Sequence, residues 1–288
     1  MIASRGFLLA LLLLQGAAAP RFDANRAWEH LRQLVALGPR PAGSVAIAQS
    51  RTYIKAQLQA AGVGVAEQAW DDQTPLGQIH LVNLVATIPG TSKDRIVIGG
   101  HYDTKRFREF RFVGANDGGS SAAFLVELAR VLKARRNPLT IELLFLDGEE
   151  AVVEWEGNDH TYGSRYYVAN AKRTGSLASL RAFILVDMIG DRDLQIKRDT
   201  NSTPWLTDAI WAAAKRKGLT AFRPEHVQIE DDHLPFVQAG VPSVDIIDLE
   251  YTAWHTPNDT LDAVSARSLQ TVGDALLAAL PQIEARLK

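Results

Sequence analysis

The sequence contains no cysteine, and this absence removes several kinds of chemistry at once. A thiolate nucleophile, a thiolate-bound metal and a disulfide are all excluded, so a metal site has to be built from His, Asp and Glu. A strong excess of one charge is also lacking, since 31 Lys and Arg face 33 Asp and Glu. With a formal net charge of -2, the chain has no field that attracts nucleic acid, and no nucleic-acid partner is expected.

A long apolar run is missing as well, because the run near the N-terminus covers only residues 6–14 and is too short to span a bilayer. A short basic segment that ends at Arg5 precedes it, and three alanines at 17–19 offer a cleavage site. This arrangement predicts a secretory signal peptide over residues 1–19; the alternative is an uncleaved N-terminal anchor. We expect a mature chain of residues 20–288 that forms one domain, is periplasmic or secreted, and has no stable membrane association.

Helix-like and strand-like patterns alternate from about residue 81 onward, after two amphipathic stretches at 24–37 and 46–61. Further helices are expected at 120–135, 162–174, 204–217 and 263–287, and strands at 81–88, 96–100, 141–146, 183–186, 194–197 and 244–247. This alternation predicts an α/β fold: a three-layer sandwich with a central, mostly parallel twisted sheet flanked by helices.

Acidic and imidazole side chains follow these strands or the turns beside them. The set comprises His101, Asp117, Glu149, Glu150, Asp187 and His255. Open α/β sheets gather their sites at the carboxyl ends of the strands. Imidazole and carboxylate ligands together suit a divalent metal, most often zinc. The sequence therefore predicts a metalloenzyme.

The adjacent carboxylates Glu149 and Glu150 are predicted to have different roles. Neighbouring side chains on a turning backbone point in different directions, so one can bind metal while the other moves protons. We expect Glu150 to bind the metal and Glu149 to act as general base and acid; a solvated acidic turn is the plain alternative. Asp187 ends an apolar strand and needs a metal or hydrogen-bonding partner. A helix N-cap is the plain interpretation of a second polar group at 231–233, and a simple helix start is the alternative for Asp117.

In this order and strand context, the set resembles the M28 family of zinc peptidases over nearly the whole mature chain. The resemblance implies peptide or protein N-termini as substrates, a monomer, and one of two chemistries. In an aminopeptidase, Asp117 would bridge two zinc ions, with His101 and Asp187 on one ion and Glu150 and His255 on the other. In a glutaminyl-peptide cyclotransferase, Asp117, Glu150 and His255 would hold a single zinc ion.

Several segments are similar to the cyclotransferase branch: residues 101–107, 162–165 and 229–236, and the Trp254 that directly precedes the last ligand. The resemblance implies that Trp155, Trp254 and Ile229 bind substrate. Glu149, Asp187 and Asp231 would be the catalytic residues. The expected reaction converts an N-terminal glutamine to pyroglutamate and releases ammonia.

A secreted dizinc aminopeptidase is the alternative. Residues 114–117 are closer to the sequence motif of the aminopeptidases than to that of the cyclotransferases. The second-metal candidates His101 and Asp187 are both present. Gly118 stands where many aminopeptidases carry a second aspartate, which favours one zinc ion. By resemblance, we expect a cis peptide bond between Asp117 and Gly118.

Overall fold

The computed structural model describes residues 21–288, so the signal peptide expected at 1–19 lies outside the described residues. The first half of the chain contains α1 (Ala24–Ala36), α2 (Val45–Ala60), β1 (Gly64–Thr74), β2 (Gly77–Ile88), β3 (Ser92–His101), α3 (Gly119–Lys133) and β4 (Leu139–Leu146). The second half contains α4 (Tyr162–Thr174), a 3-10 turn at Ser176–Ser179, β5 (Leu180–Asp187), β6 (Ile196–Asp199), α5 (Pro204–Arg216), β7 (Phe222–Val227), α6 (Leu234–Gln238), β8 (Ser243–Ile247) and α7 (Ala266–Leu287).

A six-stranded sheet in the order β1-β2-β4-β3-β5-β8 lies at the centre of the fold. The strands β4, β3, β5 and β8 pair in parallel, whereas β2 pairs antiparallel with both of its neighbours. Only β2 therefore runs against the rest of this sheet. The expected mostly parallel sheet is confirmed.

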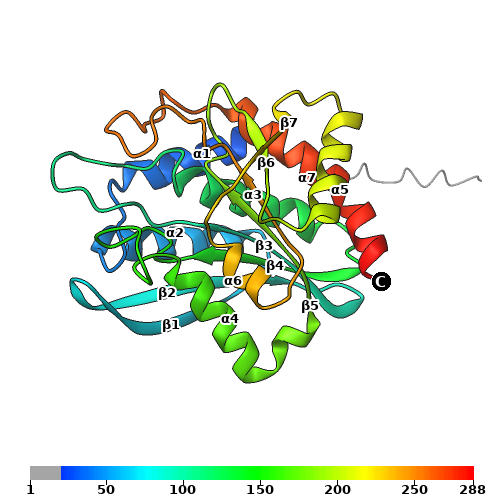
Figure 1. The fold of residues 1–288 in the computed structure, drawn as a ribbon, viewed down its shortest axis with the longest axis horizontal. Helices are drawn as coiled ribbons and strands as arrows, with labels where there is room; N and C mark the ends of the chain where they lie inside the picture. The colour runs from blue at the N-terminus through cyan, green and yellow to red at the C-terminus, as the bar shows by residue number, and fades with distance from the viewer. Residues whose placement is uncertain (1–20) are drawn as a thin grey trace, which may run out of the picture.

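Helices cover both faces of the sheet (Figure 1). Ile96 and Ile98 of β3 belong to the larger apolar core, which includes residues of α1, α3, α5 and α7. Val97 points to the opposite face and packs with residues of α4 and α6. Because successive strand residues face opposite sides, both layers bury apolar side chains of the same strand. The expected three-layer sandwich is confirmed.

Local sequence signals fix several helix starts. The Asp23 side chain accepts hydrogen bonds from the backbone N–H groups of Asn25 and Arg26 at the start of α1. Ser44 accepts one from the N–H of Ile47 at the start of α2. Such caps satisfy N–H groups that have no partner within the helix. Within residues 21–288, no helix is both long and apolar enough to cross a membrane.

Several elements, the short helix α6 among them, differ from the sequence-based expectation. Strand β1 was not expected, and it pairs with β2 along its whole length at the sheet edge. Strand β7 was also not expected; it pairs with β6 in a separate two-stranded sheet, so β6 does not join the central one. Helix α7 begins at Ala266 rather than at 263, because the Ser265 side chain caps it through the N–H of Arg267.

Candidate metal centre and active site

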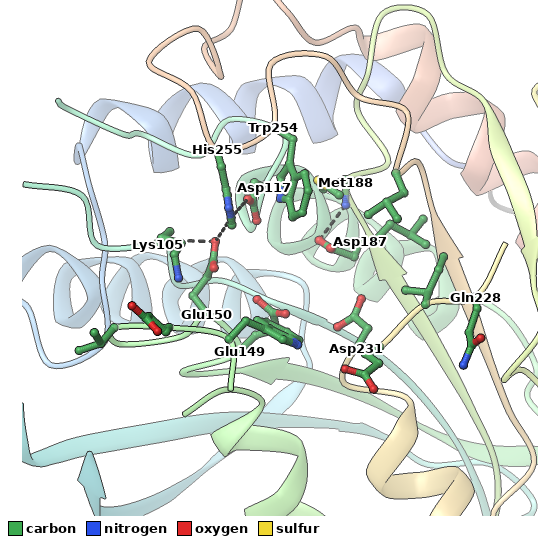
Figure 2. A pocket seen from close by; sticks show the side chains of 17 residues that line it. Lys105, Asp117, Glu149, Glu150, Asp187, Met188, Gln228, Asp231, Trp254 and His255 are labelled. Carbon is green, nitrogen blue, oxygen red and sulfur yellow. Dashed lines mark hydrogen bonds and ion pairs between the residues drawn. The ribbon is translucent and has the colours of Figure 1, made fainter. Parts of the chain in front are cut away.

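The candidate site lies at the carboxyl ends of the parallel strands. His101 is the last residue of β3 and Asp187 the last of β5. Glu150 follows the end of β4, and His255 lies in the loop between β8 and α7. Figure 2 shows that Asp117, from the turn before α3, points toward Glu150 and His255. Five separate segments thus bring their polar side chains to one place.

Two groups of side chains have metal-binding geometry, and Asp117 belongs to both. Asp117, Glu150 and His255 form one group, and His101, Asp117 and Asp187 form the other. In each group the three candidate ligand atoms lie within 4.8 Å of one another. The fold therefore brings together all five side chains that the sequence suggested as ligands.

The individual distances agree with this arrangement. His255 Nε2 lies 3.2 Å from Glu150 Oε1 and 3.3 Å from Asp117 Oδ2. His101 Nε2 lies 3.0 Å from Asp187 Oδ1 and 3.2 Å from Asp117 Oδ1. The two oxygens of Asp117 therefore face different imidazoles.

Two glycines shape the turn that presents Asp117. Gly114 and Gly118 have positive φ angles of 51° and 76°. A Cβ atom at Gly118 would lie 2.1 Å from the carbonyl oxygen of Asp103, so a larger residue does not fit there. The expected cis bond between Asp117 and Gly118 is wrong: residues 21–288 contain no cis peptide bond. The chain turns here through the positive φ of Gly118 instead.

Asp103 ties two strand ends together, a role that the sequence did not reveal. Its carboxylate accepts hydrogen bonds from the backbone N–H groups of Glu149 (3.2 Å) and Glu150 (3.3 Å). The same carboxylate lies 3.4 Å from His101 Nδ1, on the side of the ring that faces away from Asp117. A carboxylate behind a metal-binding imidazole orients the ring and selects its tautomer.

The buried carboxylates at this site favour the binding of a cation. Burial raises the pKa of Glu150 to about 7, and the neighbouring Asp117 carboxylate adds to the shift. Burial alone would also raise the pKa of Asp117, but the His101 and His255 imidazoles outweigh it and lower that pKa. Asp117 Oδ2 is buried and accepts no hydrogen bond. A buried carboxylate oxygen that has no hydrogen bond and lies between imidazoles and other carboxylates fits a divalent metal.

Glu149 and Asp231 differ from the ligand candidates, because neither belongs to a metal-binding group. Glu149 is 7% exposed, and burial raises its pKa well above the ordinary value. Burial and the nearby Asp187 carboxylate likewise raise the pKa of Asp231, whose Oδ2 atom has no hydrogen-bonding partner. The N-cap alternative for residues 231–233 is wrong, since α6 has His233 at its N-cap position and no side-chain cap.

A cavity of about 400 Å³ opens above these carboxylates. Nine of the ten residues suggested from the sequence line it, and the tenth, His101, lies buried beneath them at 1% exposure. Trp155 and Trp254 are 38% and 44% exposed on the cavity wall, and Ile229 is buried between neighbours. The aromatic and apolar walls expected by resemblance therefore do surround one space (Figure 2).

Sequence reasoning missed several residues of this cavity. Val153 and Leu249 line its mouth and are 47% and 37% exposed. With the two tryptophans they make up four of the six exposed large apolar side chains in residues 21–288. His160 lies outside this lining and stacks on Trp155 with ring centroids 4.1 Å apart. Val153 and His160 lie in the loop between β4 and α4, whereas Leu249 lies in the loop after β8, and no local sequence pattern marks these positions.

Comparison with known protein families identifies the class. The model of Peptidase family M28 matches residues 83–280, and the chain belongs to this family. The matched region includes all five candidate ligands. It also includes Glu149 and Asp231, the two carboxylates that belong to neither ligand group.

Named relatives narrow the class further. A glutaminyl-peptide cyclotransferase-like protein of Mus musculus is 32% identical over 272 residues, which cover 83% of this chain and 70% of the relative. The crystal structure of an Acidobacteriales bacterium glutaminyl cyclase is 39% identical with a TM-score of 0.89, covering 99% of this chain and 100% of the other. A leucine aminopeptidase precursor from Bacteroides thetaiotaomicron is 28% identical with a TM-score of 0.83, covering 91% and 98%. The similarities to the cyclotransferase-like protein and to the Acidobacteriales bacterium glutaminyl cyclase assign the chain to the glutaminyl cyclase branch of the family.

Proposed function

We propose that the protein is a zinc-dependent glutaminyl-peptide cyclotransferase, which converts the N-terminal glutamine of peptides or proteins to pyroglutamate. The observation that carries this proposal is the aromatic-walled cavity above the carboxylates, with Glu149 free of both ligand groups. The similarity to the Acidobacteriales bacterium glutaminyl cyclase supports it. The comparison with Peptidase family M28 supports a metal-dependent enzyme.

The reaction needs positioning more than it needs a water nucleophile. The substrate's α-amine nitrogen forms a bond to its own side-chain amide carbon, and the bond from that carbon to the amide nitrogen breaks to release ammonia. One proton passes from the amine to the leaving nitrogen. Trp155 and Trp254 would hold the flexible glutamine side chain in the folded shape that brings the reacting atoms together. Enclosing walls would also keep water from competing.

Glu149 is the proposed proton carrier. Its carboxylate would take the proton from the attacking amine and give it to the departing ammonia. A buried carboxyl with a raised pKa suits both directions of this transfer. Asp187 and Asp231 would accept hydrogen bonds from the substrate's N–H groups, since both line the cavity.

Asp117, Glu150 and His255 would hold one zinc ion, as two carboxylates and an imidazole are ligands that zinc accepts. When bound there, zinc supplies a Lewis acid that polarises the amide carbonyl of the substrate. The Phe107 and Phe112 rings pack edge-on against the His255 ring, with centroids 5.6 and 5.9 Å away. These contacts restrict the imidazole before any metal binds.

A dizinc aminopeptidase is the second candidate, and one specific observation favours it. His101, Asp117 and Asp187 form a complete second ligand group. The leucine aminopeptidase precursor from Bacteroides thetaiotaomicron is also similar to this chain. In that case two zinc ions would be bound, and Glu149 would activate a water molecule.

Mass spectrometry of two peptide incubations separates the candidates. Purified protein is mixed with a peptide that begins with Gln and, separately, with one that begins with Leu. We expect the Gln peptide to lose the mass of ammonia and the Leu peptide to stay intact. Release of free N-terminal residues from the Leu peptide would refute the cyclotransferase and support the aminopeptidase.

We further propose that residues 1–19 are a signal peptide and that residues 20–288 form a single catalytic domain. The basic start and the short apolar run of the sequence support export to the periplasm or the medium. The exported enzyme would act as a monomer on peptide or protein N-termini. N-terminal sequencing of the secreted protein tests the cleavage site.

A further inference from the structure

Two buried side chains of opposite charge hold the loop that carries the shared ligand. We call residues 113–117 the ligand loop, because they connect the region after β3 to Asp117. Arg40 lies before α2 and Asp259 lies four residues after His255, and both are 0% exposed. Neither belongs to a ligand group or lines the main cavity. Nothing in their local sequence marks them as part of the site.

Arg40 holds the carbonyl side of the ligand loop. Its Nη1 donates to the carbonyl oxygen of Val113 at 2.8 Å, and its Nη2 donates to that of Gly114 at 3.1 Å. Its Nε donates to the carbonyl oxygen of Tyr102 at 3.3 Å, next to His101. The planar guanidinium therefore joins the end of β3 to the ligand loop, which a point-like ammonium group does not reproduce.

Asp259 holds the amide side of the same loop. Its Oδ1 accepts from the N–H of Asn116 at 2.8 Å, and its Oδ2 accepts from the N–H of Asp117 at 3.1 Å. Its backbone carbonyl accepts from the N–H of Ala115 at 3.3 Å. The Tyr251 hydroxyl donates to Oδ1 at 2.7 Å and fixes the carboxylate. The loop that carries His255 is thereby attached to the loop that carries Asp117.

The two charges complement the peptide dipoles of the ligand loop. A cation lies at the carbonyl oxygens and an anion lies at the amide hydrogens, so each interaction is charge-assisted. The bonds of Arg40 go to backbone carbonyls, and the carboxylates of Asp259, Asp103 and Asp117 favour its charged form against the effect of burial, which lowers its pKa. Loss of Arg40 would remove three bonds from the backbone carbonyls of Tyr102, Val113 and Gly114, and loss of Asp259 would leave the N–H groups of Asn116 and Asp117 without their acceptor.

We propose that Arg40 and Asp259 are positioning residues, which clamp the ligand loop from opposite sides and so fix Asp117 for metal binding. This proposal rests on the metal site of the proposed function. Because Asp117 belongs to both ligand groups, a small displacement of its backbone changes every candidate metal position at once. The clamp thus acts on metal affinity through the backbone of a ligand rather than through the metal.

The test measures zinc affinity and folding separately. Arg40→Met, Asp259→Asn and the double variant are compared by competition with a chromophoric zinc chelator and by thermal unfolding of the metal-free protein. Arg95→Met is the matched control, because Arg95 makes a partly buried ion pair with Glu142 at 2.8 Å outside the site. Tyr251→Phe is a milder variant that removes only the hydroxyl bonded to Asp259. It keeps the test possible if Arg40→Met or Asp259→Asn does not fold.

We expect each clamp variant to weaken zinc binding about 10- to 100-fold, as loss of an outer partner of a ligand does. The double variant should lose less than the product of the two single losses, since both act on one loop. Arg95→Met should lower the unfolding temperature and leave zinc affinity unchanged. The clamp would be overturned if all clamp variants had lowered unfolding temperatures but kept a zinc affinity within about twofold of the unmodified protein. The proposed metal site would not be affected by that result. Absence of zinc binding by the unmodified protein would overturn the metal site and the clamp with it.

Discussion

Replacing Glu149 by glutamine separates proton transfer from metal binding, because Glu149 belongs to neither ligand group. The amide is nearly the same size as the carboxylate, so the cavity and the ligands keep their places. It does not accept the proton of the attacking amine. With only 7% of Glu149 exposed, bulk water has little access to replace it as the proton carrier. The variant should therefore bind zinc and substrate and turn over slowly.

The expected size of the effect follows from the role. A positioned general acid–base group contributes about 10²- to 10⁴-fold in rate, which corresponds to about 3–5 kcal/mol of activation free energy. We expect kcat for ammonia release from a Gln peptide to fall within that range, while KM changes by less than about threefold. Metal analysis of the purified variant checks that zinc is retained.

A matched control uses another glutamate of the same cavity. Glu154 lines the cavity but is exposed, so Glu154→Gln should change kcat by less than about threefold. The reasoning is refuted if Glu149→Gln keeps more than about a tenth of the original kcat with its zinc in place. Loss of zinc from this variant would instead show that Glu149 is a ligand.

Four further predictions test other parts of the site and fold. Glu150→Ala removes one candidate ligand and should lose zinc on dialysis, so stoichiometric zinc by metal analysis would contradict its role. Trp254→Ala should raise KM about tenfold with zinc retained, and an unchanged KM would remove this side chain from the substrate pocket. Leu249→Ser at the mouth of the cavity should lower kcat/KM more for a Gln-Phe peptide than for a Gln-Gly peptide. Val45→Ser is the control, because Val45 is exposed outside the cavity, and it should affect neither peptide. Equal losses for both peptides would count against an apolar contact between Leu249 and the second substrate residue. Burial raises the pKa of Asp248 from 3.8 to about 7, so its contribution to stability is fully present at low pH and is lost as pH rises toward about 7. Asp248→Asn should flatten that dependence in urea unfolding, and an unchanged slope would argue against the shift.

The elements that position the site were predictable because they are short apolar runs. Strands β3, β4 and β5 are covered on both faces, so their sequences are nearly continuous in buried residues and their polar ends stand out. Strand β1 lacks this signal, since most of its side chains are exposed or half-buried at the sheet edge. Pairing with β2 stabilises it, and pairing is not visible in a local pattern. Strand β7 was missed because most of its side chains are exposed or half-buried and because it contains Pro224, which is unusual within a strand.

The limit of sequence reasoning at the site lies in what each side chain bonds to. His101, Asp117 and Glu150 were found because ligands must be particular residue types at strand ends or in the turns that follow them, and residue type is what a sequence displays. Arg40 and Asp259 bond to backbone carbonyl and amide groups, which almost every residue offers, so their partners carry no signature. Asn116 and Asp259 are 143 positions apart. Only the folded backbone brings them together, and residues of this kind have to be found from hydrogen bonds rather than from motifs.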